Sequence, residues 1–304
     1  MSNASVVQPA LLGKINERQV LRAIQALGPL SRAEVSRHAG MSAPTASKAV
    51  ESLLRAGLLE EVDGPVPGET AGPARGRPAR KLALASRAVQ VLGLVIDAGQ
   101  CRMVSAGLDG RLHDDAPDAF PTPSTYDAFL ATATAVAERL LDRPGVNTLG
   151  LGISMPGLID YRHQRGALSP NVPITDGRSP GLDLAERLGI ESVLVQETHA
   201  LCLAERYYGE ARGIDDFAML DVATGVGLGV MSGGRMLTGH SGLAGEIGHI
   251  TVDADGRPCG CGNAGCLETL ACDSALAREV SARLGRNLSI DQVIYECRRS
   301  GHSS

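Results

Sequence analysis

The segment 259–268, CGCGNAGCLE, places three cysteines within eight residues, with glycines between them. Seven cysteines in 304 residues would be ordinary, but this local density is not. In the cytosol thiols stay reduced, so clustered cysteines there are more often metal ligands than disulfide partners. The cluster therefore favours a metal-bound loop, and the alternative is a set of free reduced thiols.

Composition places the chain among soluble globular proteins. Hydrophobic residues make up 43% and charged residues 21%, and 304 residues leave room for two or three domains. No run approaches the ~20 apolar residues that span a bilayer. The N-terminus lacks the basic start and apolar run of a signal peptide. We therefore expect a cytoplasmic protein, and the other cysteines are predicted to be small core residues: Cys101, Cys202, Cys272 and Cys297.

Charge is unevenly spread along the chain. Residues 1–86 carry 11 Lys and Arg against 7 Asp and Glu, a net charge of +4, whereas the remainder carries −9. A basic N-terminal part on an acidic body is typical of a nucleic-acid-binding domain joined to a domain of another kind.

Residues 16–60 predict three successive helices. In the first, about residues 16–27, apolar side chains recur at helical spacing. The second opens with Ser31 and Glu34, the pattern of a capping box. The third opens at Ser42, and Pro44 lies in its first turn, where proline is tolerated. Short helices joined by a glycine-containing turn predict a helix-turn-helix.

The third helix would be the recognition helix of that motif. Its first turns carry small polar and basic side chains, which can approach phosphates and base edges in a major groove. The alternative is a helical module that binds another protein. The residues expected against DNA are Ser42, Ala43, Pro44, Thr45, Ser47 and Lys48.

Two predicted strands, residues 58–62 and 81–84, follow the third helix and would complete a winged helix. The Pro- and Gly-rich loop between them would be the wing. Its Arg75 and Arg77 could reach a DNA backbone or minor groove. A solvated linker is the alternative interpretation of this loop.

From residue 89 onward, strand-turn-strand units alternate with helices, which indicates an α/β body. Two glycine turns, Asp97–Gln100 and Thr224–Gly227, could direct backbone amides at a phosphate; the ordinary interpretation of each is a hairpin. The expected domains are 14–63 for the winged helix-turn-helix, 64–88 for the wing and linker, and 89–304 for the body.

The segments SGLAGEIGHI (241–250) and CGCGNAGCLE resemble the signature of the ROK family of repressors, open reading frames and kinases. GISMPG, SPN and ATGVG give weaker support. The resemblance covers about residues 14–295 and implies an actin-like (ribonuclease H-like) two-lobed sugar-kinase-type body. The N-terminal winged helix is similar to that of the family's repressor branch. The chain ends soon after the cysteine loop, so the resemblance implies an incomplete second lobe.

This resemblance implies that the cysteine loop binds a metal ion and indicates which residues are its ligands. His249, Cys259, Cys261 and Cys266 supply one imidazole and three thiolates. Four protein ligands suit a closed, tetrahedral structural zinc site and leave no open position for catalysis.

The resemblance also implies which residues contact a sugar. Carboxylates, amides and imidazole can all form hydrogen bonds with the hydroxyl groups of a sugar. The matching positions are Asn171, Glu197, Glu246, His249 and Glu268. The alternative is that Glu246 and Glu268 only support the metal ligands.

Kinase chemistry is where the chain departs from the family. The first phosphate loop of ROK kinases reads DxGGT, but here Gln100 and Cys101 replace its last glycine and threonine. Glu197 stands at the position of the catalytic Asp, and Gln196 at that of the preceding Asn. A base displaced by about 1 Å can cost ~100-fold in rate. We therefore expect no kinase activity.

The sequence thus predicts a DNA-binding transcriptional regulator of sugar metabolism, and we expect it to act as a repressor. We expect it to bind operator DNA as a homodimer, since two half-sites match two-fold symmetry. A sugar or amino sugar would be the effector. The alternatives are an ATP-dependent sugar kinase and a DNA-binding regulator whose body only dimerises.

Overall fold

The structure, a computed structural model, describes residues 9–62, 80–114, 117–240 and 242–300. The chain divides into two compact units. The first comprises residues 1–153 and 181–193, and the second comprises residues 154–180 and 194–304. Each unit is described by itself below. Among the described residues, no helix is both long enough and apolar enough to cross a membrane.

The first unit begins with three helices and a small sheet. The helices are α1 (Pro9–Leu27), α2 (Arg32–His38) and α3 (Ala43–Arg55). The strands β1 (Leu30–Ser31), β2 (Leu59–Val62) and β3 (Lys81–Leu84) form an antiparallel sheet in the order β1-β3-β2. The first helix starts earlier than residue 16, and β1 was not expected. The predicted arrangement of three helices followed by two paired strands is confirmed.

Aliphatic side chains from all three helices form the core of this winged helix. Val20, Val35 and Val50 have no exposed surface, and Ile24 and Leu53 are 2% exposed. Burying each side chain of this size contributes about 1.5–3 kcal/mol. The helical spacing that predicted these elements is therefore the spacing of the core.

Side chains close the N-termini of α2 and α3. The Ser31 N–H donates to Glu34 Oε2 at 2.7 Å, and the Glu34 N–H donates back to Ser31 Oγ at 3.3 Å, which completes the predicted capping box. These hydrogen bonds from Ser31 lower the pKa of Glu34. At α3 the Thr45 N–H donates to Ser42 Oγ at 3.4 Å. Both helix starts are therefore fixed by local sequence.

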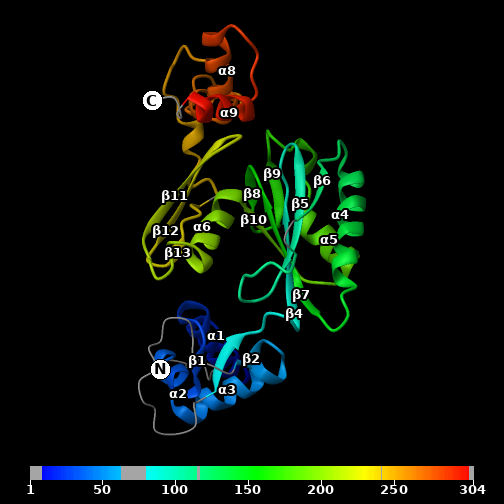
Figure 1. The fold of residues 1–304 in the computed structure, drawn as a ribbon, viewed down its shortest axis with the longest axis vertical. Coiled ribbons are helices and arrows are strands. Elements are labelled where there is room, and N and C mark those ends of the chain that lie inside the picture. Colours follow the sequence, from blue (N-terminus) through cyan, green and yellow to red (C-terminus); the bar gives the residue numbers. More distant parts are fainter. Residues whose placement is uncertain (1–8, 63–79, 115–116, 241, 301–304) are drawn as a thin grey trace, which may run out of the picture. The chain divides into compact units, whose positions relative to one another are not determined.

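A five-stranded sheet in the order β10-β7-β4-β5-β6 forms most of the rest of the first unit, and residues 154–155 of β7 and 194–196 of β10 belong to the second unit. The helices α4 and α5 lie on the same face of the sheet (Figure 1). β4, β5 and β6 pair antiparallel. The elements are β4 (Val89–Val95), β5 (Gln100–Ala106), β6 (Asp118–Pro121), α4 (Tyr126–Leu141), β7 (Asn147–Met155), α5 (Pro180–Leu188) and β10 (Ser192–Gln196).

The second unit is built on the antiparallel sheet β11-β12-β13, and α6 covers one face of it (Figure 1). Glycine permits the close approach of α6, because a Cβ on Gly229 would lie 2.4 Å from Cys202 Sγ. On the other face, Leu220 and Val222 are 56% and 50% exposed. The elements are α6 (Glu197–Tyr208), β11 (Phe217–Val222), β12 (Val226–Ser232) and β13 (Arg235–Met236).

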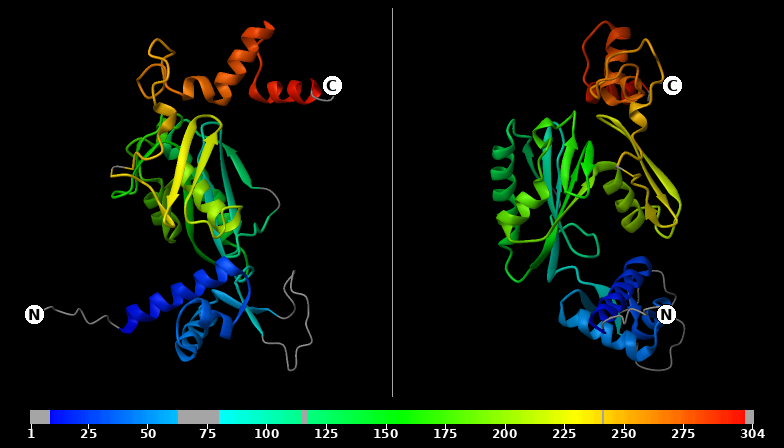
Figure 2. Two further views of the ribbon diagram at one scale, coloured as in Figure 1. Left: turned by 90° about the vertical axis from the view of Figure 1, so that its left-hand side faces the viewer. Right: turned by 180° about the vertical axis from the view of Figure 1, so that it is seen from behind.

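Short elements before and after that sheet complete the second unit. The axis of α9 turns away from that of α8 (Figure 2), and Ala277, Leu288 and Val293 form a small core between them. The elements are β8 (Leu158–Asp160), β9 (Arg165–Leu168), the 3-10 helices η1 (Pro173–Thr175) and η2 (Ile247–His249), α7 (Glu268–Ala271), α8 (Asp273–Leu284) and α9 (Ile290–Ser300).

The cysteines outside the cluster mostly lie where they were expected. Cys101, Cys202 and Cys272 are buried, as predicted for small core residues. The prediction for Cys297 is wrong, because its thiol is exposed on α9. Helical periodicity places a residue on a helix but does not say which face the rest of the fold covers.

Candidate metal centre and ligand site

Four side chains of the second unit converge in the loop between η2 and α7. The ligand atoms of His249, Cys259, Cys261 and Cys266 all lie within 4.8 Å of one another. Nδ1 of His249 is 3.6 Å from Cys259 Sγ, and the Sγ atoms of Cys261 and Cys266 are 3.8 Å apart. The sequence-predicted ligand set therefore forms one cluster.

The distances within this cluster fit a four-coordinate metal. With Zn–S near 2.3 Å and Zn–N near 2.0–2.1 Å, tetrahedral ligands lie about 3.8 Å apart for two sulfurs and about 3.6 Å apart for sulfur and nitrogen. Burial and the neighbouring thiols raise the pKa of Cys266 to about 12. Three thiols this close cannot all ionise unless a cation lies among them. The four residues can thus hold a metal ion.

Backbone contacts fold the loop around the cluster. The Cys259 N–H donates to Asn263 O at 2.7 Å, and the Gly265 N–H donates to Arg257 O at 2.8 Å. Gly265 has φ +65°, and a Cβ there would lie 1.5 Å from Asp253 O. Only glycine fits that position, so the loop brings its cysteines together through a turn that its own sequence requires.

Glu246 lies between the cluster and β10. Its Oε2 is 3.8 Å from Nε2 of His249, the ring nitrogen that does not face Cys259. Its Oε1 accepts a 2.6 Å hydrogen bond from Nε2 of Gln196. His249 can therefore serve a metal through Nδ1 and a ligand hydroxyl through Nε2, which reconciles the two roles predicted for it.

Glu268 lies beside another residue of the cluster, Cys259. Its Oε1 is 4.0 Å from Cys259 Sγ, and its Oε2 accepts from the Val226 N–H at 3.2 Å. A Cβ on Gly225 would lie 2.6 Å from that Oε2 and 4.0 Å from Nδ2 of Asn171. Asn171, Glu268 and the β11–β12 turn thus meet at one place. Glu197, the remaining predicted sugar contact, begins α6 directly after Gln196 and is half-buried.

Both glycine turns considered as phosphate loops join antiparallel strands. Asp97–Gln100 leads from β4 into β5, and Thr224–Gly227 leads from β11 into β12. In the second turn the Val226 N–H is taken by the Glu268 carboxylate. An amide that already holds a carboxylate is not free to hold a phosphate oxygen.

The sequence did not single out Tyr161 and His199. The Tyr161 hydroxyl accepts from the Gln196 N–H at 3.2 Å and lies 2.8 Å from Nδ1 of His199. His199 is 2% exposed, and burial lowers its pKa. Burial also raises the pKa of Tyr161. A histidine in the first turn of a helix gives no sign from sequence alone that it will be enclosed.

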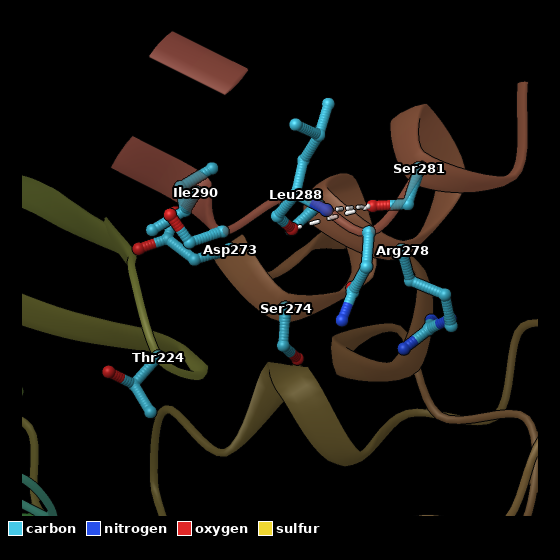
Figure 3. Close-up of a pocket in the computed structure, with 10 residues that line it drawn as sticks. Thr224, Asp273, Ser274, Arg278, Ser281, Leu288 and Ile290 are labelled. Carbon is cyan, nitrogen blue, oxygen red and sulfur yellow. Dashed lines mark hydrogen bonds between the residues drawn. The ribbon is translucent and has the colours of Figure 1, made fainter. Parts of the chain in front are cut away.

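A cavity of about 520 Å³ lies elsewhere in the second unit, between Thr224 and the helices α8 and α9 (Figure 3). Ser281 closes one wall by accepting from the Leu288 N–H at 2.9 Å. None of the predicted sugar-contacting residues lines this cavity. Its lining comprises Thr224, Asp273, Ser274, Ala277, Arg278, Ser281, Asn287, Leu288, Ser289 and Ile290.

The expected DNA contacts from Ser42 to Lys48 lie at the start of α3. Ser42, Ala43, Pro44 and Lys48 are exposed, whereas Thr45 and Ser47 are half-buried. Two of these polar groups bond to each other, since Ser42 Oγ and Thr45 Oγ1 are hydrogen-bonded at 2.8 Å. The wing arginines Arg75 and Arg77 lie outside the described residues.

An actin-like α/β body with a metal-ligand loop, preceded by a winged helix, is the architecture of one class of proteins. The ROK family model matches residues 94–303, and a MarR family model matches residues 14–68. The chain belongs to the ROK family and carries an N-terminal MarR-like winged helix domain.

Relatives and solved structures agree with this assignment. The chain is 27% identical to the DNA-binding transcriptional dual regulator NagC of Escherichia coli strain K12, over 89% of this chain and 65% of that protein. It is 30% identical to the repressor Mlc of the same organism, over 93% of this chain and 70% of Mlc. The chain thus spans about two thirds of the length of these relatives.

A ROK family transcriptional regulator described as a homolog of the E. coli MLC protein has a similar structure. It superposes with a TM-score of 0.73 at 26% identity, over 90% of this chain and 68% of that one. A ROK hexokinase from Thermus thermophilus gives a TM-score of 0.55 at 33% identity, over 66% of each chain. The fold is therefore shared by regulators and kinases, and only the site can separate the two functions.

Proposed function

We propose that this chain is a DNA-binding transcriptional repressor of sugar metabolism whose body binds a sugar effector and a structural zinc ion. One observation carries the proposal: Glu246 and Glu268 each lie beside a member of the metal-ligand cluster, His249 and Cys259 respectively, within a single unit. The names of relatives add support, since NagC, Mlc and the regulator of similar structure each match about nine tenths of this chain, winged helix included.

Zinc suits the donor set of one imidazole and three thiols better than a hard cation would, because hard cations prefer oxygen. Bound by His249, Cys259, Cys261 and Cys266, it would act as a structural cross-link. The loop would then hold Glu246 and Glu268 at fixed positions beside the cluster. Removing the ion would release both carboxylates together.

A sugar is the ligand that this arrangement fits. Glu246 Oε2, His249 Nε2, Glu268 and the Asn171 amide offer acceptors and donors suited to hydroxyl groups. Glu197, next to Gln196, would add a further acceptor at the start of α6. Two carboxylates in one site also disfavour an anionic group at that end of the ligand.

The winged helix would place α3 in a major groove, with Ser42, Ala43, Pro44, Thr45, Ser47 and Lys48 toward the DNA and Arg75 and Arg77 reaching from the wing. We propose that domains 14–63, 64–88 and 89–304 divide these tasks. A cytoplasmic homodimer would occupy two half-sites. Sugar binding would change DNA affinity by favouring one arrangement of the body.

Two features disfavour the kinase alternative. Gln100 and Cys101 stand in the first phosphate loop, and Cys101 is fully buried, so its thiol cannot face a phosphate as a threonine hydroxyl would. In the second turn, the Val226 N–H is already bonded to Glu268.

The test is a thermal-shift screen of the purified chain against D-xylose, D-glucose, N-acetylglucosamine and N-acetylmannosamine, each with and without ATP and Mg²⁺. Metal content is measured on the same sample. A shift with one sugar, none with ATP, and about one zinc per chain would support the proposal. ATP-dependent phosphorylation of any of these sugars would contradict the proposal and show that the chain is a sugar kinase. A folded, zinc-containing sample that responds to none of them would favour a DNA-binding regulator whose body dimerises but binds no ligand.

A further inference from the structure

Gln196 is a buried polar side chain, and both the nitrogen and the oxygen of its amide are hydrogen-bonded. It is 7% exposed and lies where β10 meets α6. Its Nε2 donates to Glu246 Oε1 at 2.6 Å, and its Oε1 accepts from Thr198 Oγ1 at 3.2 Å. The amide is thus oriented from both ends, because Thr198 can only donate to the oxygen while the nitrogen faces the carboxylate.

The backbone of Gln196 is also held. Its N–H donates to the Tyr161 hydroxyl at 3.2 Å, and that hydroxyl lies 2.8 Å from Nδ1 of the buried His199. Tyr161 follows β8 directly, and a Cβ on Gly242 would lie 3.6 Å from its ring. Gln196 therefore projects its amide from a backbone position that is bonded to Tyr161, 35 residues away in sequence.

This arrangement leaves Glu246 with one oxygen for a ligand. Oε1 is taken by Gln196, whereas Oε2 faces His249 Nε2 at 3.8 Å. A single ligand hydroxyl placed between these two atoms could accept from the imidazole and donate to the carboxylate. Because the amide of Gln196 is neutral, it orients the carboxylate without cancelling its charge.

We propose that Gln196 is a positioning residue for the effector: it fixes the rotation of the Glu246 carboxylate so that Oε2 meets a ligand hydroxyl beside His249. This inference rests on the proposed sugar-binding function. In this role Gln196 acts through Glu246. Thr198 sets the orientation of Gln196 and so acts one step further away.

Two variants and their combination test this role. Gln196→Met keeps the length of the side chain and removes both amide atoms, and Thr198→Val keeps the shape and removes the hydroxyl. The control is Gln292→Met on α9, whose Oε1 accepts from the Ser289 N–H at 2.9 Å in the same unit. Calorimetric titration gives the Kd of each zinc-loaded protein for D-xylose, D-glucose and N-acetylglucosamine.

Gln196→Met is expected to weaken the binding of the preferred sugar about tenfold to a hundredfold, the effect of losing one hydrogen bond to a charged group. Thr198→Val is expected to weaken it by a smaller factor and to add nothing in the Gln196→Met background, because it acts through Gln196. The zinc content of both variants should equal that of the wild type. The control Gln292→Met should bind the sugar with the wild-type Kd.

Four results would overturn the inference. Wild-type affinity in a folded Gln196→Met protein would show that the amide does not orient the ligand-binding oxygen. Losses that multiply in the double variant would show that Thr198 and Gln196 act independently, which is a packing role. Failure of the wild type to bind any of the three sugars would remove the proposed function first, and this inference with it. If Gln196→Met does not fold, a Thr198→Val protein with unchanged Kd overturns the inference by itself.

Discussion

Nε2 of His249 lies 3.8 Å from Oε2 of Glu246, whereas Nδ1 of the same ring faces Cys259 Sγ at 3.6 Å. One imidazole thereby joins a metal-ligand cluster to a carboxylate that is suited to a sugar hydroxyl. Disturbing the cluster should therefore disturb ligand binding, even though none of the cysteines needs to touch the ligand.

Cys266→Ser is expected to abolish metal binding and to lower the melting temperature by about 10 °C or more, since a structural zinc site would contribute several kcal/mol to folding. Differential scanning calorimetry and metal analysis measure the two effects. Cys297→Ser is the matched control, because that thiol is exposed and lies outside the cluster. Equal melting temperatures for the two variants would refute a structural role for the metal.

Gly265→Ala should abolish metal binding, because a Cβ at that position would lie 1.5 Å from Asp253 O in a backbone of φ +65°. Gly262→Ala in the same loop has φ +93° and open space around the added methyl group. It should cost only the conformational strain, about 1–2 kcal/mol, and keep the metal. Metal retention by both variants would mean that the loop does not hold the ligands as described.

Acid should destabilise the fold through His199. Burial lowers the pKa of this imidazole, so the folded state favours its neutral form. The stability gained from neutral His199 is present above the unfolded pKa near 6.5 and is lost as the pH falls below that value. The melting temperature of the wild type should therefore fall between pH 7 and pH 5 by more than that of His199→Gln. The exposed His240→Gln variant should follow the wild type, and identical pH profiles for all three proteins would count against this assignment.

Lys48→Ala should weaken DNA binding by a similar factor on every duplex and reduce the slope of log Kd against log salt by about 1, the effect of losing one phosphate contact. Fluorescence anisotropy at several salt concentrations measures it, on a duplex that the protein selects from a random library. Arg283→Ala on α8 removes an exposed cation of the second unit and should leave the slope unchanged. A slope that Lys48→Ala does not alter would remove α3 from the DNA interface.

Local sequence predicted the features that depend on local contacts. The capping box of Ser31 and Glu34 and the glycine-bounded cysteine loop are encoded within a few residues, and each forms as expected. The hydrogen bond between Gln196 and Glu246 joins residues 50 apart in sequence, and no periodicity marks it. The enclosure of His199 and the exposure of Cys297 likewise depend on which surfaces other segments cover.

The most direct test of the central claim is the Kd of the full chain for its selected duplex, measured by fluorescence anisotropy with and without D-xylose, D-glucose and N-acetylglucosamine. A sugar-responsive regulator predicts that one of these sugars changes the Kd at least about fivefold, the lower end of usual allosteric coupling. Glu246→Ala should bind the duplex normally and lose that response. Tight DNA binding by the wild type that none of the sugars alters would contradict the account.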